Sequence, residues 1–277
     1  TGTVPSVGPN RMSYFLDLRG PSEPIETACS SALIAIHRGV RAILSEGCGM
    51  VVAGGVNTLL TPEPFIIYGR AGMLSPTGRC RTFSAQADGY VRGEGVGMVV
   101  LRRLRDAEAA GDRILGIIRA SAENHGGRAQ SLTAPNPQAQ ADLVVDAWSR
   151  AGIDPRSIGY IEAHGTGTPL GDPIEVDALK QAFTRLGAGV GDHDKAGWCR
   201  LGSVKSNIGH TELAAGVAGV IKVLLQLQHG TIVPSLHAQE PNPYLALDGS
   251  PFRLADKSEP WVAPVDAAGA RLPRRAG

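Results

Sequence analysis

The chain has 277 residues, a formal net charge of +1, 43% hydrophobic residues and 5% aromatic residues. This length is enough for one large domain or two small ones, and the apolar content can fill a sizeable core. The near-zero net charge argues against nucleic acid or an anionic membrane as a partner, and no apolar run reaches the length of a membrane span.

The cysteines and the N-terminus bear on where the protein acts. The four cysteines are scattered and have no CxxC spacing, so they predict neither a disulfide framework nor a sulfur-based metal site. The chain starts at Thr1 without a Met, a basic leader or an apolar leader. We therefore expect a cytoplasmic protein, and a chain that is a piece of something longer.

The sequence alternates short strand-like runs with helical patterns, and its 36 glycines and 19 prolines suit the tight turns of an α/β protein. In the first half, a short run at Ile25–Thr27 leads into a helix at Ser30–Leu44. The pattern then predicts strands at Met50–Ala53, Val96–Leu101 and Ile114–Ala120, and a short helix at Asp106–Ala110 that Gly111 closes.

The second half continues this alternation. It predicts a helix at Pro137–Ala151 with Asn136 as N-cap, a strand at Ile158–Ala163, a helix from the N-cap Asp172 to about Phe183, a strand at Leu201–Val204 and a long helix at Thr211–Gln228. The tail from Pro260 is predicted to be a loop.

Three of these strand–turn–helix units carry a reactive residue at the turn, and the first residue is Cys29. A thiol at a helix N-terminus lies at the positive end of the helix dipole, beside free backbone N–H groups. Both favour the nucleophilic thiolate, and the same N–H groups can hold an oxyanion. The alternative interpretation of Cys29 is a buried, unreactive thiol.

The second turn begins at His164 and runs through a Gly-rich loop to Gly171. Its glycine spacing does not match GxGxxG, and it has no Lys-Ser or Lys-Thr of a phosphate loop, so we do not expect a nucleotide. The imidazole of His164 is expected beyond the edge of the sheet. The hydroxyls of Thr166 and Thr168 suit contact with an amide-bearing ligand.

The third turn places Lys205 and His210 around a helix start. The helix dipole is expected to lower the pKa of His210, so that a neutral imidazole donates to a developing oxyanion. Lys205 is expected to pair with Glu175. Two alternatives stay open: each histidine makes only a structural hydrogen bond, or His164, His210 and Glu175 bind a metal. The last has no paired-His pattern to support it, and we expect no metal.

Together and in this order, the three turns resemble the β-ketoacyl synthase family, close to modular polyketide synthases. The matching stretches are Thr-Ala-Cys-Ser-Ser around Cys29, Glu-Ala-His-Gly-Thr-Gly-Thr around His164, Lys-Ser-Asn-Ile-Gly-His ending at His210, and Asp88-Gly-Tyr-Val-Arg-Gly-Glu-Gly95. Details such as Ile25-Glu-Thr-Ala-Cys and Glu123-Asn-His-Gly-Gly are similar to the trans-acyltransferase branch.

The resemblance implies a thiolase-like fold, layered α/β/α/β/α, of which this chain holds part of the N-terminal half and most of the C-terminal half. It implies a partial ketosynthase domain at 1–259 and a loop at 260–277. That loop would lead to a Gly-rich strand whose N–H shares the oxyanion hole with the N–H of Cys29. Since this strand lies beyond Gly277, we predict poor or no condensing activity for the chain alone.

The implied reaction is polyketide chain elongation by an acyltransferase. Cys29 accepts an acyl chain, and His164 and His210 stabilise the enolate and oxyanion of a decarboxylative condensation with a malonyl thioester. By resemblance, Lys205, Glu175 and Asn207 support the histidines, and Thr166 and Thr168 contact the pantetheine.

The resemblance also bears on cofactors and partners. No cofactor is expected in the domain, because the substrates arrive on the phosphopantetheine of an acyl carrier protein. The expected partners are that carrier, a second copy in a homodimer, and flanking polyketide synthase domains or a complementary chain.

Three rival functions stay open. A non-elongating ketosynthase that only passes acyl chains on would typically lack His164. A thiolase or a chain-initiating synthase would carry a Cys-His-Asn or Cys-His-Cys set. A non-catalytic structural or dimerisation fragment would show no acylation of Cys29.

Overall fold

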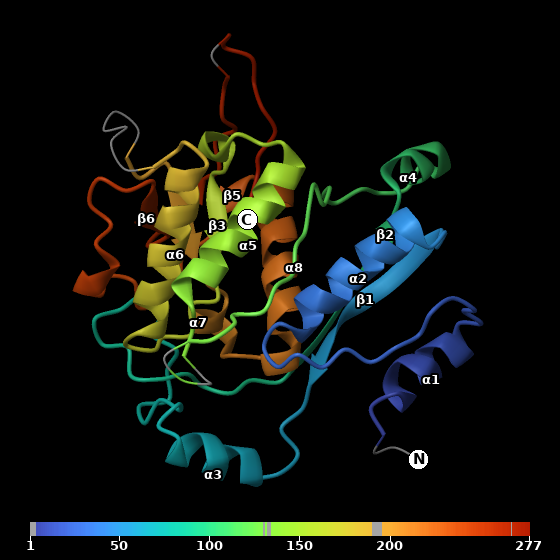
Figure 1. The fold of residues 1–277 in the computed structure, drawn as a ribbon, viewed down its shortest axis with the longest axis horizontal. Helices are drawn as coiled ribbons and strands as arrows, with labels where there is room; N and C mark the ends of the chain where they lie inside the picture. Colours follow the sequence, from blue (N-terminus) through green and yellow to red (C-terminus); the bar gives the residue numbers. More distant parts are fainter. Residues whose placement is uncertain (1–3, 130, 132–133, 190–195, 267) are drawn as a thin grey trace.

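The computed structural model describes residues 4–129, 131, 134–189, 196–266 and 268–277, and Figure 1 shows their arrangement. Helices lie on both sides of short sheets, which agrees with the predicted α/β class. On one side of the molecule lie α2 and the β1–β2 ribbon, on the other lie α5 and α6, and α8 runs between them. Among these residues no helix is both long and apolar enough to span a membrane.

The N-terminal unit consists of α2 (Ser31–Ser45) packed on an antiparallel ribbon of β1 (Met50–Asn57) and β2 (Gly95–Arg102). The register pairs Met50 with Arg102 and Asn57 with Gly95. The predicted strand at the start of β1 therefore continues through its two glycines. Only glycine fits at Gly55, because a Cβ there would lie 2.5 Å from the carbonyl oxygen of Leu213.

Three shorter helices lie outside this unit: α1 (Val7–Phe15), α3 (Glu63–Arg70) and α4 (Leu104–Ala110). Gly111 ends α4 with a left-handed φ of 71°, as the sequence predicts. The strand predicted at Ile114–Ala120 is wrong. This segment has strand-forming residues but pairs with no described strand, and its Ile and Leu side chains are largely exposed.

The C-terminal unit is a parallel sheet with the order β3 (Tyr160–Glu162), β4 (Cys199–Gly202) and β6 (Phe252–Leu254). The helices α5 (Pro137–Ala151) and α6 (Gly171–Arg185) cover it, and Phe183, Leu201 and Phe252 lie fully buried in its main core. The side chain of Asn136 accepts hydrogen bonds from two amides of α5, so the predicted N-cap is confirmed.

The segment between β4 and the next helix carries the third sequence turn. It runs through α7 (Lys205–Ile208) and the 3-10 turn η3 (Glu212–Ala214) into α8 (Ala215–His229). The strand β4 begins two residues before the predicted Leu201–Val204, and α8 begins four residues after the predicted start at Thr211.

The remaining elements complete the C-terminal side. They are the 3-10 turns η1 (Pro155–Ser157) and η4 (Pro243–Leu245), and a two-stranded sheet of β5 (Thr231–Ile232) and β7 (Glu259–Pro260). Past β7, the tail returns to the parallel sheet. Ala276 bridges Tyr160, and the N–H of Glu162 donates to the carbonyl of Gly277 over 3.0 Å. The last residues thus run parallel to β3, toward the end that carries His164.

Candidate active site

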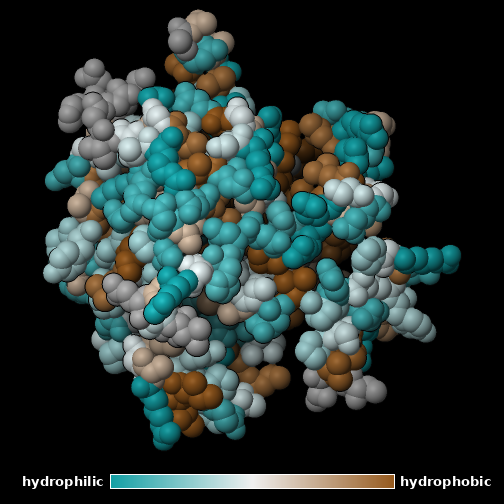
Figure 2. All heavy atoms as spheres, in the orientation of Figure 1, coloured by the Kyte–Doolittle hydropathy of each residue, from teal (hydrophilic) through white to brown (hydrophobic). Residues whose placement is uncertain are grey.

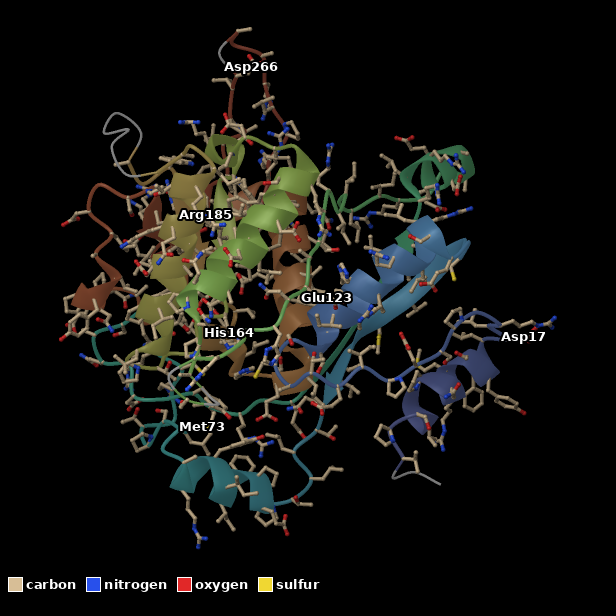
Figure 3. The ribbon with its side chains drawn as sticks, viewed as in Figure 1. Asp17, Met73, Glu123, His164, Arg185 and Asp266 are labelled. Carbon is tan, nitrogen blue, oxygen red and sulfur yellow. The ribbon has the colours of Figure 1, made fainter. Side chains whose placement is uncertain are left out.

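Cys29, His164 and His210 converge at one point, although 181 positions separate the first residue from the last. The Sγ of Cys29 and one ring nitrogen of each histidine lie within 4.8 Å of one another. Nε2 of His210 lies 3.1 Å from Sγ of Cys29, and the two imidazoles meet edge to face with centroids 5.5 Å apart. Figure 3 shows His164 in the lower centre of the molecule, near α7.

A strained turn presents Cys29. Ala28 has a left-handed φ of 54°, which is unusual for a residue with a Cβ, and the Glu26 carboxylate accepts the N–H of Ala28 over 2.9 Å. The helix α2 begins at Ser31, two residues after Cys29, and Ser30 is its N-cap. The N–H of Cys29 lies beside the sulfur of the same residue, and no other described residue accepts it, so it can turn to an oxyanion that forms there.

The electrostatics of Cys29 differ from the prediction. Burial raises the pKa of the thiol above its ordinary value of 9.0. The positive charge of Lys205 opposes this shift and the negative charge of Glu212 adds to it. The predicted preference for thiolate is therefore wrong for this structure, because loss of water around sulfur outweighs the charge of Lys205 and the backbone N–H of Cys29.

The tautomer of His210 follows from its neighbours. Its Nδ1 accepts the N–H of Glu212 over 3.0 Å, so the proton of a neutral ring lies on Nε2, which faces Sγ of Cys29. Burial first, and Lys205 second, lower the pKa of His210 to about 2. The predicted neutral imidazole is confirmed, but its cause is burial. The helix α8 starts five residues later, beyond the reach of its dipole.

The loop of His164 is shaped by a partly buried carboxylate. Glu175 accepts the N–H of His164 over 2.6 Å and the N–H of Gly165 over 2.9 Å. The loss of water around the ring lowers the pKa of His164, and the positive charge of Lys205 lowers it further. The side chain of His164 nevertheless keeps a surface that is open to solvent. The open surface lets His164 meet an incoming substrate.

Asp172 has a different role from the predicted N-cap. The helix α6 starts at Gly171, and Asp172 accepts the N–H of Phe83 over 2.7 Å and the N–H of Gly167 over 3.1 Å. Burial raises the pKa of Asp172 to about 7, while these amide donors oppose the shift. Its carboxylate thereby joins the loop of His164 to the segment around Phe83.

Thr166 and Thr168 lie together on this loop, with their hydroxyl oxygens 3.3 Å apart. Thr166 is buried, whereas Thr168 is partly exposed. Their position beside His164 is compatible with the expected contact to pantetheine, which stays a prediction.

Lys205 is buried but forms no ion pair with Glu175, so the predicted direct pairing is wrong. Within the described residues no ion pair or hydrogen bond reaches its Nζ, and the oxygens of Glu175 accept backbone amides. Burial lowers the pKa of Lys205, and the charge of Glu175 opposes this at longer range. Lys205 thus acts on both histidines and on Cys29 through its field.

Asn207 lies apart from the three reactive groups. Its side chain is exposed and accepts a hydrogen bond from Ser206 over 3.1 Å. It lines a groove of about 720 Å³ between β2 and α8. The supporting role expected for Asn207 therefore has no contact in this structure that carries it.

Two ion pairs near the site were not predicted. Arg92 pairs with Glu212, two residues after His210, and Lys222 pairs with Glu162, two residues before His164. Both pairs have a residue in a stretch that the sequence already marks. Arg92 lies in the stretch from Asp88 to Gly95, and Glu162 begins the motif around His164.

Glu175 does not join His164 and His210 in a set of ligand atoms that lie within 4.8 Å of one another, and each of its oxygens accepts a backbone amide. The structure instead groups the two histidines with Cys29. These donor types also suit zinc, so the expected absence of a metal stays a prediction.

Two sequence-family models match the chain. Residues 1–107 match the N-terminal domain of β-ketoacyl synthases, and residues 115–239 match their C-terminal domain. This chain belongs to the β-ketoacyl synthase family. Its thiolase-like fold agrees with solved ketosynthase structures. The oxazolomycin ketosynthase domain of Streptomyces albus has a TM-score of 0.94 and 48% identity over 100% of this chain. The module 6 ketosynthase of the bacillaene synthase of Bacillus subtilis has a TM-score of 0.92 and 45% identity over 99% of this chain.

Longer polyketide synthases are similar as well. Polyketide synthase PksN of Bacillus subtilis is 58% identical over 275 residues, which are 99% of this chain and 5% of that protein. Polyketide synthase ThaG of Burkholderia thailandensis is 46% identical over 100% of this chain and 5% of its own length. The chain also spans 47% of each of the two solved ketosynthases. The expected membership among polyketide synthase ketosynthases is confirmed.

Proposed function

We propose that this ketosynthase chain carries the acyl-accepting and decarboxylating groups of a polyketide elongation reaction. The observation that carries the proposal is the contact of Cys29 with a histidine whose tautomer is already fixed. Nε2 of His210 lies 3.1 Å from Sγ of Cys29, while its Nδ1 is occupied by the N–H of Glu212. The imidazole is therefore a hydrogen-bond donor toward sulfur and cannot readily act as a base.

The first half-reaction is acyl transfer from the phosphopantetheine of an acyl carrier protein. Sulfur of Cys29 attacks the thioester carbonyl, a new C–S bond forms, and the carrier thiol leaves with the proton that Cys29 loses. The N–H of Cys29 supports the tetrahedral oxyanion in this step. Burial raises the pKa of Cys29 and so disfavours the thiolate, while the positive charge of Lys205 opposes this shift.

The second half-reaction is decarboxylative condensation. A malonyl thioester loses carbon dioxide, and the electron pair of the broken C–C bond forms an enolate that His164 and His210 stabilise as neutral donors. The enolate carbon then attacks the acyl carbonyl on Cys29. A C–C bond forms, the C–S bond breaks, and the released thiolate takes up a proton. Lys205 favours each anionic stage through its positive charge.

The partners of the chain belong to this proposal. The strands β1 and β2 present an apolar surface. A complementary chain, a flanking segment or a second copy can bind there. The exposed side chains on the outer face of the ribbon are Val52, Val56, Val96, Met98 and Val100. Figure 2 shows apolar surface in the recess between the part that holds α5 and α6 and the part that holds α2. The chain spans 47% of a solved ketosynthase, so the remainder of such a domain fits this role.

The test of this function measures carbon dioxide release from a malonyl carrier thioester. We expect release by the wild-type chain, strong loss in His164→Ala and His210→Ala, and no loss in His229→Ala, whose side chain is exposed at the end of α8. Equal release by all four chains would refute the roles of the two histidines. Full condensation by the lone chain would contradict the prediction of poor activity in isolation.

A further inference from the structure

A second set of groups lies behind His210, on the side away from Cys29. The segment around Arg92 runs alongside His210: the N–H of His210 donates to the carbonyl of Val91 over 2.7 Å, and the N–H of Gly93 donates to the carbonyl of His210 over 2.9 Å. These two bonds fix the backbone of His210. They do not fix the orientation or the tautomer of its ring.

The ring is oriented by the backbone of Glu212. Its N–H donates to Nδ1 of His210 over 3.0 Å, and Glu212 holds a left-handed φ of 43° to do so. This conformation is strained for a residue with a Cβ and persists only when neighbouring contacts maintain it. The side chain of Glu212 therefore needs a strong partner.

Arg92 is that partner. Its Nε lies 2.5 Å from Oε1 of Glu212 and its Nη2 lies 2.8 Å from Oε2, which is the two-point geometry of a guanidinium on a carboxylate. The side chains are only 6% and 15% exposed, so water screens the pair little. The rings of Phe65 and Tyr68 in α3 flank the guanidinium at 4.6 Å and 5.3 Å.

We propose that Arg92 is a positioning residue that fixes the tautomer of His210 through Glu212. The order of contacts is Arg92 to the Glu212 carboxylate, the Glu212 N–H to Nδ1 of His210, and Nε2–H of His210 to Sγ of Cys29. Without Arg92 the turn at Glu212 relaxes, Nδ1 loses its donor, and the ring is free to carry its proton on the nitrogen that faces away from Cys29. The proposal rests on the proposed function only for the use of this hydrogen bond in catalysis.

Two measurements on purified Arg92→Gln test this inference. The first is ring ¹⁵N NMR of His210, assigned with His210→Gln. We expect one Nε2–H tautomer in the wild type and a mixture of tautomers in Arg92→Gln. The second is the alkylation rate of Cys29 by iodoacetamide, assigned with Cys29→Ala. Loss of one hydrogen bond to the developing thiolate is expected to slow it about tenfold.

The matched control is Arg200→Gln. Arg200 pairs with Glu259 at 15% and 19% exposure, and both residues lie on the C-terminal sheets. We expect this variant to keep the wild-type tautomer and alkylation rate. A folded Arg92→Gln that retains a pure Nε2–H tautomer would overturn the proposal. If Arg92→Gln does not fold, the isosteric Glu212→Gln takes its place. A mixture of His210 tautomers in that variant would support the proposal, and a pure Nε2–H tautomer would overturn it.

Neither measurement uses a carrier substrate. A chain that fails to release carbon dioxide but shows the tautomer change would contradict the proposed function and support the role of Arg92. A wild-type chain that releases carbon dioxide, together with an Arg92→Gln variant that shows no tautomer change, would support the proposed function and contradict the role of Arg92.

Discussion

At the scale of single residues, the site combines charged side chains with backbone amides that donate hydrogen bonds to them. Glu175 is the clearest case, since its two oxygens accept the N–H groups of His164 and Gly165. Burial raises the pKa of Glu175, and the amide donors act against that shift. The carboxylate thus determines where the imidazole of His164 stands without touching its ring.

We predict that Glu175→Ala destabilises the chain by about 1–3 kcal/mol, because the exposed N–H of His164 and the partly buried N–H of Gly165 lose their acceptor. The free energy of unfolding in urea measures this. Asp142→Asn is the control, since Asp142 forms a solvent-exposed pair with Arg185, and exposed pairs contribute little to stability. Equal losses in the two variants would contradict the role given to Glu175.

His210 makes stability depend on pH. Its folded pKa of about 2 lies below the ordinary 6.5, so its contribution is present above pH 6.5 and is lost as pH falls toward 2. Asp172 has the opposite sign, because its raised pKa of about 7 makes stability fall as pH rises from about 4 to 7. Between about pH 4 and pH 7, the two residues therefore change the stability of the chain in opposite directions.

A comparison of variants separates the two effects. We predict that between pH 7 and pH 4.5 the wild type loses about 3 kcal/mol more stability than His210→Gln, since Asp172 is common to both. Urea unfolding at the two pH values measures the difference, and His229→Gln controls for removal of an exposed histidine. Parallel losses in the wild type and His210→Gln would show that His210 is not buried in its neutral form.

At the scale of elements, one buried cluster joins the three segments that carry Lys205, His164 and His210. Nζ of Lys222 in α8 donates to Oε2 of Glu162 in β3 over 2.8 Å and to the hydroxyl of Tyr160 over 2.7 Å. Oε1 of the same Glu162 accepts the N–H of Val204, just before Lys205, over 2.6 Å. The pair is 9% exposed on each side.

We predict that Lys222→Met destabilises the chain by about 3–5 kcal/mol, because it leaves a buried carboxylate without its cation. The double variant Lys222→Met with Glu162→Gln should lose less than the sum of the single variants. Urea unfolding of all four chains gives the coupling. Strict additivity would mean that the pair does not join these elements.

The sequence allowed the elements and the reactive turns to be predicted, because both depend on local patterns. For the helix at Pro137–Ala151, both the N-cap and the apolar periodicity can be recognised from residues that are close in sequence. Tertiary contacts decided the rest. Asp172 had the position of an N-cap but accepts amides from the segment around Phe83, 89 positions earlier. Burial of Cys29, which raises its pKa, depends on neighbours that no local pattern reveals.

At the scale of the whole molecule, the outer face of the β1–β2 ribbon is an apolar surface that no described element covers. Val56, Val96 and Val100 are 52%, 73% and 63% exposed on neighbouring strands that form only a two-stranded sheet. An apolar sheet face with open edges favours association. We expect the remainder of a ketosynthase domain, or a second copy, to cover it.

We predict that Val96→Lys with Val100→Lys reduces association of the purified chain, measured by sedimentation velocity across a range of concentrations. Exposed Leu170, on the His164 side, gives the control Leu170→Lys, which should leave association unchanged. If the paired lysines do not alter the sedimentation of a chain that associates, this face is not the contact surface.

If Cys29 is the acyl acceptor beside a donating His210, an acyl-carrier thioester will transfer its acyl group to this residue. Intact-protein and peptide mass spectrometry after incubation with that thioester detects the transfer. We expect one added acyl group on the peptide that holds Cys29, none in Cys29→Ala, and slower addition in His210→Ala. Acylation that persists in Cys29→Ala, or a folded wild type that is never acylated, would contradict the account.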